Sequence, residues 1–543
     1  MSIVRDYLHD VLRRARVPME PFDYEVDWVD QPRRHKVYPR TAMIPLPAPE
    51  DEGNESVAGG ESDEGRPFAI GALSAMLANS YGITGRRLAI HTNEDVGGLP
   101  YYRTATWSRG TANGGGLYPL EVTLVSGPAA DLTPGIYGYA TAHHGLTRLA
   151  TGDASTRIHA ALAAAGYVSD ADQYLVVSVK FWKNAFKYNT FSYHVVSMDV
   201  GALLGTWRLW ARANGRAIQI FQWFDEDAVN DVIGVDGIGE GVFAVVALGP
   251  ASTTSTLEET STLKLRASNE ESERSHSVRT FDRIELVHKE TAAGATAPRG
   301  IPARGGAEVA HRGAPLAPPT VPTLTQSEAF RARRSSFGRF ADNKPLAPGQ
   351  LHAVLEAGSE LLGVADEFLN EAPLTRLAVF VNHVDGIEPG SYWFDPPTGS
   401  LLPIELGPHG LLLQRSYFLQ NYNLEQAAAV IVVTAKPFLV MDVAGDRGYR
   451  VVNAAVGSVA QQIYTTAASL GIGAGAALGF DNIGLLEALN GPQDAVSREV
   501  GIGPEVEWPM LIVAVGNERA AQADFRAVLY TADCGIGIGR THD

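Results

Sequence analysis

The chain contains almost no cysteine and no long apolar run. Cys534 is the single cysteine in 543 residues, which excludes an intrachain disulfide and any zinc site built from several cysteines. No segment approaches the ~18 to 20 consecutive apolar residues that a membrane-spanning helix needs. Residues 1–18 have helical apolar spacing but lack the continuous apolar core of a signal peptide. We therefore expect a cytoplasmic protein with no membrane contact and no metal site.

Positive charge is also scarce. Lysine and arginine number 44 against 61 aspartate and glutamate residues, a formal charge of −17. A nucleic-acid partner requires a basic face that neutralises phosphates, so we expect none, although a small basic pocket is compatible with this balance. Much of the acid lies in residues 49–65, which have the composition of a solvated linker.

One long phrase occurs twice in the chain. Residues 193–215 and 449–471 have the same length and align without a gap, at an offset of 449 − 193 = 256. A repeat of this size indicates two copies of one domain. The expected organisation is a lead-in with an acidic linker over residues 1–65, a first domain over 66–250, a linker over 251–325, a second domain over 326–520 and a tail over 521–543.

Both copies of the phrase are predicted to be helices. Gly201 and Gly457 lie in the middle of them, where glycine costs about 1 kcal/mol relative to alanine, so we expect close helix packing at these positions. The sequence leaves open whether the two helices pack against each other or each against its own sheet. Apolar spacing predicts a further helix over 70–82. Alternation and β-branching predict strands over 120–127, 174–182, 242–249, 376–382, 428–435 and 509–516, and one in the linker over 279–287.

Residues 330–340, FRARRSSFGRF, contain four arginines and two serines. Guanidinium groups bring positive charge in a forked geometry and serine adds a hydrogen-bond donor, so this segment suits a phosphate group. The alternative is a basic stretch that only faces solvent. The candidate residues are Arg333, Arg334, Ser336 and Arg339.

Two further candidates lie in the first copy. Residues 109–121, RGTANGGGLYPLE, include three consecutive glycines, whose backbone amides can closely approach a planar or anionic ligand. Lys187 and Tyr188 precede the repeated helix, and a lysine beside a phenol can accept or relay a proton. The alternatives are a flexible loop, and a lysine that extends to solvent beside a tyrosine that packs.

In combination these segments resemble the SagB-type azoline dehydrogenases, flavoproteins of the nitroreductase fold. The resemblance covers most of the chain. In the first copy it is carried by IGALSAML, SRGTANGGGLYPLEV, PGIYGYATAHHGLTRL and FKYNTFSYHVVSMDVG, and in the second by RRSSFGRF, GDRGYRVVNAAVGSVAQQIY, LGFD and IVAVG. It implies an α+β fold with two tandem nitroreductase-like domains, each a mixed, mainly antiparallel sheet flanked by helices, forming a pseudo-dimer within the chain.

The resemblance also implies an FMN cofactor at the domain interface. The phosphate-binding R-x-S motif of the family matches Arg334-x-Ser336. The loop that contacts the flavin ring matches Asn113-Gly114-Gly115, with asparagine in place of the usual serine. The catalytic pair of the azoline oxidases matches Lys187-Tyr188. The remaining positions expected to contact the cofactor are Arg109, Arg333, Arg339, Gln461, Leu478, Gly479 and Arg519.

Each copy lacks what the other keeps. The first copy has Arg66-Pro67 where the phosphate motif is expected. The second copy has Val443-Ala444 in place of the catalytic pair and lacks 278 − 256 = 22 residues at the ring loop. The two copies are therefore expected to form one complete site, with one FMN per chain.

The resemblance implies oxidation of a peptide thiazoline or oxazoline to the azole, on a modified precursor peptide and beside a cyclodehydratase partner. Two other functions stay open. One is an NAD(P)H-dependent nitro- or ene-reductase, or a reductase of dehydroamino acids. The other is a flavin-free scaffold in a cyclodehydratase complex. The sequence leaves the oligomeric state open, including a further homodimer.

Overall fold

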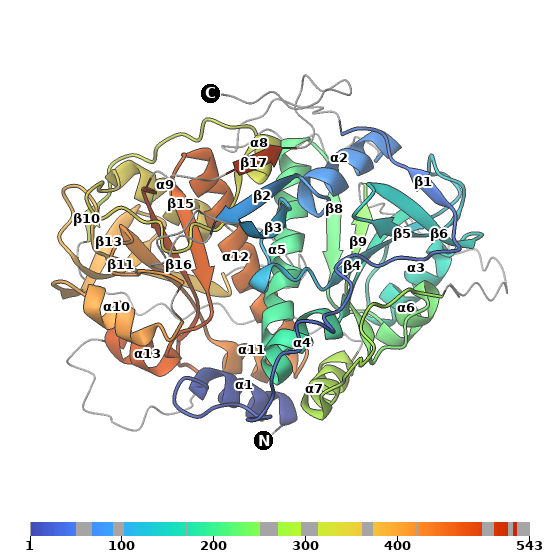
Figure 1. Ribbon diagram of the computed structural model, residues 1–543, viewed down its shortest axis with the longest axis horizontal. Helices are drawn as coiled ribbons and strands as arrows, with labels where there is room; N and C mark the ends of the chain where they lie inside the picture. The colour runs from blue at the N-terminus through green and yellow to red at the C-terminus, as the bar shows by residue number, and fades with distance from the viewer. Residues whose placement is uncertain are drawn as a thin grey trace.

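The computed structural model consists of two lobes joined along a pair of central helices (Figure 1). It describes residues 2–49, 68–90, 102–169, 171–249, 270–294, 313–360, 373–419, 421–490, 504–519 and 525–528. Nearly all of the acidic stretch 49–65, the Arg66-Pro67 step and the glycine-rich residues beyond 528 lie outside these ranges.

Each lobe is built on one seven-stranded sheet. The first sheet has the order β1 (Met43–Pro45), β6 (Gly145–Thr151), β5 (Gly135–Ala140), β4 (Leu120–Ser126), β7 (Gln173–Lys180), β9 (Glu240–Leu248) and β8 (Ile218–Phe221). The second has the order β10 (Ala314–Pro315), β13 (Ser400–Leu406), β12 (Gly390–Asp395), β11 (Thr375–Val381), β14 (Ala429–Ala435), β16 (Trp508–Gly516) and β15 (Gly473–Ala477).

Strand order matches position for position between the two sheets. Every strand pairing in the described ranges is antiparallel. The six strands predicted within the two copies are all present, because their alternating β-branched residues suit a sheet with both faces covered. The α+β fold predicted from the sequence is confirmed.

Helices cover both sheets. In the first lobe they are α2 (Ile70–Ser80), α3 (Ser155–Ala164), α4 (Trp182–Tyr188), α5 (Ser192–Ala213) and α6 (Glu226–Ile233), with the short turns η1 (Gly114–Gly116) and η2 (Asn189–Phe191). In the second they are α8 (Gln326–Ala332), α9 (Pro348–Ser359), α10 (Gly410–Ser416), α11 (Pro437–Ala444), α12 (Gly448–Ser469) and α13 (Asn482–Asn490). One large apolar core includes α5, α12 and residues of both lobes, and a smaller core lies on the other face of each sheet.

The two central helices α5 and α12 pack directly against each other, which settles the question that the sequence left open. A Cβ atom on Gly201 would lie 1.9 Å from the Ala454 carbonyl oxygen, and one on Gly457 would lie 1.9 Å from the Met198 carbonyl oxygen. Backbone therefore meets backbone at both glycines. Only a residue without a side chain permits this separation.

A buried ion pair also joins the lobes. The Arg450 guanidinium of α12 donates to the Glu226 carboxylate of α6 at 2.7 Å and to the Tyr193 hydroxyl of α5 at 2.9 Å. Both charged side chains are buried, and Arg447 of the segment before α12 lies 3.4 Å from the same carboxylate. Removing Glu226 would therefore leave two buried guanidinium groups without their carboxylate.

The linker strand predicted over 279–287 is wrong. Residues Asp282–Ala292 form an α-helix, α7, in which Ile284, Val287, His288 and Thr291 are buried. These positions follow the helical spacing of three and four residues, whereas the run Ile-Glu-Leu-Val imitates strand alternation over too short a distance. Acidic Asp282 and Glu285 in the first turn further favour the helix.

The N-terminal helix α1 (Ile3–Arg13) bridges the lobes. Its Tyr7 hydroxyl donates to the Thr190 carbonyl of the first lobe at 2.8 Å, while the neighbouring Arg14 donates to Asn482 of the second at 3.1 Å. No helix in the described ranges is long and apolar enough to cross a membrane.

The C-terminal strand β17 (Phe525–Val528) returns to the first half. It pairs with β2 (Gly85–Ile90), which pairs with β3 (Tyr102–Ser108), and the three form a separate sheet. This sheet lies between the lobes in Figure 1. The β2–β3 hairpin belongs to the first-half segment that is longer than its counterpart, and the sequence did not predict that the tail would join it.

The glycine contact between α5 and α12 leads to a stability prediction. Gly201→Ala should lower the free energy of unfolding by about 1 to 3 kcal/mol, the usual cost of overpacking, even though alanine favours helix by about 1 kcal/mol. Gly484→Ala in α13 is the matched control, because its Cβ would meet only the end of the Asp481 side chain, at 3.0 Å. Urea denaturation measures both variants. Equal midpoints for Gly201→Ala and the wild type would contradict the close contact.

Candidate functional site

A pocket of about 250 Å³ opens in the second lobe between the start of the domain and the edge strand β15. Arg334 and Ser336 both line it, with Tyr464 of α12, Gly473 of β15 and Glu518. Ser336 is completely buried, yet its hydroxyl has no hydrogen-bond partner among the residues that the structure describes. A buried donor without a partner costs free energy unless a ligand or water satisfies it, so this pocket suits a ligand with acceptor oxygens.

Backbone pairing sets the position of Ser336. Its N–H donates to the Ala474 carbonyl at 2.9 Å, next to the isolated bridge between Ser335 and Ala474. Gly473 leaves room for the side chains, since a Cβ there would lie 2.5 Å from the Ser336 hydroxyl oxygen. The short segment after α8 is thus held against β15, and this pairing places the serine in the pocket.

A carboxylate shares this pocket with Arg334. Glu518 forms an ion pair with the Arg334 guanidinium, and its second oxygen, Oε1, is buried without a partner in the described part of the chain. An anionic ligand would compete with Glu518 for Arg334. The neighbouring Arg519 does not line the pocket; its N–H donates to the Arg339 carbonyl at 2.7 Å and its guanidinium bonds Gln426.

The second lobe holds the glycine-rich loop of the first lobe. Arg333 donates to the Gly110 carbonyl at 2.9 Å and to the Arg109 carbonyl at 3.0 Å. Gln461 of α12 accepts from the Ala112 N–H at 2.8 Å and donates to the Gly110 carbonyl at 3.1 Å. Arg333 therefore faces the other lobe, while its neighbour Arg334 faces the pocket.

Arg109 has a packing role in this structure. Its guanidinium carbon lies 4.5 Å from the ring centroid of Tyr81 and 4.1 Å from that of Tyr118. Stacking of this kind stabilises a buried guanidinium. The side chain therefore supports the loop from within the first lobe.

The tip of the loop lies against the Lys187-Tyr188 pair. Gly115 has a φ of +68°, and a Cβ there would lie 2.4 Å from the Tyr188 hydroxyl oxygen and 3.1 Å from Lys187 Nζ. Both the backbone conformation and the contact require glycine. Lys187 Nζ also lies 4.8 Å from the Tyr188 ring centroid and 6.0 Å from that of Trp28 in the lead-in. Residues 113–115 and 187–188, predicted separately, therefore meet in space.

Leu478 and Gly479 face this region from the second lobe. The Leu478 carbonyl accepts from the Arg14 guanidinium, and the Gly479 carbonyl accepts from the Phe418 N–H at 3.0 Å. A Cβ on Gly479 would lie 2.6 Å from the Leu419 side chain. Tyr417, which forms an isolated bridge with Phe480, has a pKa raised by burial and then by Tyr188.

Asp199 and Glu518 contact the candidate residues and were missed. The Asp199 carboxylate accepts hydrogen bonds from the loop at Asn113 and Gly114. One sequence signal for Asp199 was available: the equivalent position of the second copy, 199 + 256, is Ala455, so only the half with the loop keeps the acid. Nothing in the pattern Asn-Glu-Arg indicated that Glu518, rather than Arg519, would face the pocket.

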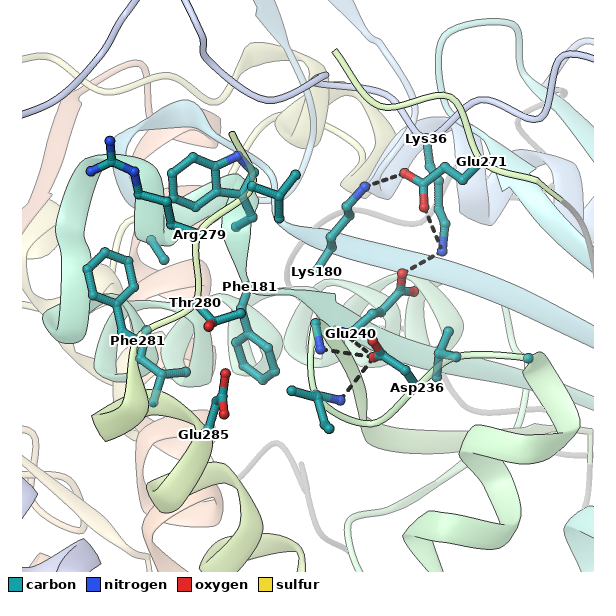
Figure 2. A pocket seen from close by; sticks show the side chains of 18 of the residues that line it. Lys36, Lys180, Phe181, Asp236, Glu240, Glu271, Arg279, Thr280, Phe281 and Glu285 are labelled. Carbon is teal, nitrogen blue, oxygen red and sulfur yellow. Dashed lines mark hydrogen bonds and ion pairs between the residues drawn. The ribbon is translucent and has the colours of Figure 1, made fainter. Parts of the chain in front are cut away.

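A second cavity, of about 310 Å³, lies in the first lobe (Figure 2). Lys180 and Glu271 pair across it, and Lys36 pairs with Glu240 at 2.5 Å, as the dashed lines show. The charges in this network neutralise one another, and none of the predicted site residues lines the cavity. No cluster of three or more potential metal ligands occurs in the described part of the chain.

Comparison with known proteins identifies the fold. Residues 330–517 match the Nitroreductase family. A curated relative from Methanocaldococcus jannaschii, named "Putative nitroreductase MJ1384", is 37% identical over 102 residues, or 18% of this chain and 50% of the relative. The chain thus spans about half the length of that protein.

Solved structures extend the similarity to both halves. A crystal structure from Anabaena variabilis with the same nitroreductase description is 22% identical, with a TM-score of 0.71 over 96% of this chain and 100% of its own. The E. coli microcin synthetase McbBCD complex with truncated pro-MccB17 bound is 16% identical over 46% of this chain and 92% of the matched chain. Its TM-score of 0.28 supports no argument about function. The chain therefore has the nitroreductase fold across both halves, and its residues 330–517 are similar to the Nitroreductase family.

Proposed function

We propose that the protein is an FMN-dependent dehydrogenase that oxidises peptide thiazolines or oxazolines to azoles. One observation supports this most strongly. Arg333 and Gln461 of the second lobe hold the first-lobe loop whose tip touches Lys187 and Tyr188. The phosphate-type pocket of the second half and the proton-transfer pair of the first thereby belong to a single assembly.

The pocket residues fit the phosphate of FMN. The unpaired buried Ser336 hydroxyl can donate to a phosphate oxygen, and the Arg334 guanidinium can exchange its Glu518 partner for the phosphate. Charge-assisted bonds of this type are among the strongest hydrogen bonds in proteins. Leu478 and Gly479 from one side, and Asn113 to Gly115 from the other, would hold the ring. FMN, when bound, supplies the acceptor for a hydride.

The chain itself supplies the proton acceptor and a loop tip without side chains, which lets the substrate approach that acceptor. The oxidation of an azoline to an azole removes two hydrogens from the ring, one as a proton and one as a hydride. Dioxygen is the proposed final electron acceptor. Lys187 or Tyr188 accepts the proton from the ring carbon, since both terminal groups lie at the loop tip. Because the loop tip is glycine, no side chain at that position stands between this pair and a planar substrate.

The position that corresponds to Gly479 in the first half carries a large side chain. At the offset of 256, Gln222 and Trp223 stand where the second half has Leu478 and Gly479. Trp223 is buried, with 1% of its surface exposed, so an indole occupies the position that is glycine in the other half. Together with Val443-Ala444 in place of Lys187-Tyr188, this supports one flavin per chain.

The substrate and partner follow from the azoline resemblance. The proposed substrate is a modified precursor peptide that carries the azoline ring, delivered in the cytoplasm by a cyclodehydratase partner. A reductase that consumes NAD(P)H would share the fold. It differs in the direction of electron flow, so a pyridine nucleotide would then be the electron donor.

The cofactor proposal predicts flavin content. Flavin released by denaturation should equal one per chain in the wild type. Arg334→Ala combined with Ser336→Ala should weaken FMN binding at least tenfold, since charge-assisted bonds contribute about 1.5 to 3 kcal/mol each. Glu518→Gln is the matched opposite variant: it removes the competing carboxylate and should tighten binding. A ratio near two, or full yellow colour in the double variant after dialysis, would refute the assignment.

The catalytic proposal predicts a loss of rate without a loss of flavin. Lys187→Ala and Tyr188→Phe should keep one flavin per chain and lose azole formation by ~10² to 10⁴-fold, the usual contribution of a positioned proton acceptor. Mass spectrometry of an azoline peptide measures the loss of two hydrogens. Full activity in both variants would reduce the pair to packing. Rapid NADPH oxidation by the wild type would favour the reductase instead.

A further inference from the structure

Asp199 lies buried on α5 behind the glycine-rich loop. Its Oδ1 accepts from the Gly114 N–H at 2.7 Å, and its Oδ2 accepts from the Asn113 side-chain amide at 2.6 Å. Asp199 forms no ion pair among the described residues. A buried carboxylate without a cation is unfavourable, so the two donors of the loop are its main compensation.

The orientation of Asn113 fixes the protonation state that this arrangement needs. Its side-chain oxygen accepts from the Leu117 N–H at 2.9 Å and from the Tyr118 N–H at 2.8 Å. The amide NH₂ must therefore point toward Asp199, and the amide cannot flip without losing two bonds. Gly114 N–H is a donor in every state. Both carboxylate oxygens thus face donors, and a protonated carboxyl would turn its own O–H against one of them.

We propose that Asp199 is a positioning residue for the proposed reaction: as a carboxylate it holds residues 113–115 against Lys187 and Tyr188, and on protonation it releases one of the two bonds. The inference rests on the proposed function only where it assigns the loop to a reaction. The hydrogen-bond polarity requires neither flavin nor substrate.

The charge of Asp199 changes within a pH range in which the protein can be studied. Burial raises the pKa of Asp199 to about 7, against the lowering effect of the bonds from Gly114 and Asn113. The titratable groups around it are Tyr81 at the end of α2, and Lys187 and Tyr188 of α4, which reach the same loop at Gly115. Burial raises the pKa of Tyr81, and the Asp199 carboxylate raises it further. The Arg109 guanidinium from the loop stacks on Tyr81.

Local order and global stability should then respond to pH in opposite directions. The pKa of folded Asp199 lies above its ordinary value of 3.8, so the folded state binds the proton more tightly than the unfolded state. The contribution of this group to stability is therefore present at low pH and is lost as the pH rises toward 7. The loop, by contrast, gains its second bond only as the carboxylate forms. A residue that served packing alone would not make loop order and global stability change in opposite directions with pH.

Hydrogen exchange tests the proposal on the full-length protein without cofactor or substrate. Peptides covering residues 109–118 should lose protection at least tenfold between pH 8 and pH 6, after correction for intrinsic exchange rates. Asp199→Asn should show low protection at both values, because its NH₂ faces a donor permanently. Ser197→Ala is the matched control, since Ser197 is buried on the same helix and bonds only the Tyr193 carbonyl, at 2.7 Å; it should respond like the wild type.

Equal loop protection at pH 6 and pH 8 in the wild type would overturn the proposal, and that measurement does not depend on whether a variant folds. So would a wild-type pH response in Asp199→Asn, because the titrating group would then lie elsewhere. Where turnover can be measured, the fall in rate below pH 7 should be absent from Asp199→Asn and present in Ser197→Ala. A failure of azoline oxidation would leave the exchange result unaffected, so the two proposals can be judged apart.

Discussion

The close approach of α5 and α12 is the contact on which the rest of the structure depends. With glycine at the crossing point of each helix, the two backbones touch, and the two lobes are held at one fixed separation. That separation lets Gln461 on α12 reach the Gly110 carbonyl. It also brings the second-lobe segment around Gly479 toward Tyr188. Wider packing around ordinary side chains would separate the halves of the site before any of its polar contacts could form.

Duplication within one chain explains how the halves could become different. In a symmetric dimer every substitution appears in both subunits, so a tryptophan at position 223 would be present in both halves. In the tandem chain, a buried Trp223 stands in one half where the other half has Gly479, packed closely against Leu419. Likewise Asp199 supports the loop in the half that has one, and Ala455 replaces it in the half that does not.

Much of the fold could be read from the sequence, because the repeat and the β-branched alternation are strong local signals. The partner of α5 could not, since the same apolar stripe would be buried against a sheet or against another helix. The helix α7 was mistaken for a strand because a short run of four residues within it, Ile-Glu-Leu-Val, imitates the alternation of a strand. At the site, residue types predicted the chemistry but not the direction of side chains. Arg109 was expected at the ligand, yet it stacks on tyrosines that neighbour it only in three dimensions. Glu518 was unremarked, yet it shares the pocket with Arg334.

The three-stranded sheet formed by β2, β3 and β17 has a consequence for biosynthesis. The hairpin that leads into the glycine-rich loop is made early, near residue 85, whereas the strand that completes its sheet is made near residue 525. On the ribosome, the first lobe can fold around its own sheet while this hairpin still has an open edge, the kind of edge that invites pairing with other chains. This three-stranded sheet would therefore be the last part of the molecule to form, and premature termination shortly after the second lobe would leave a protein with both cores intact and an unprotected edge.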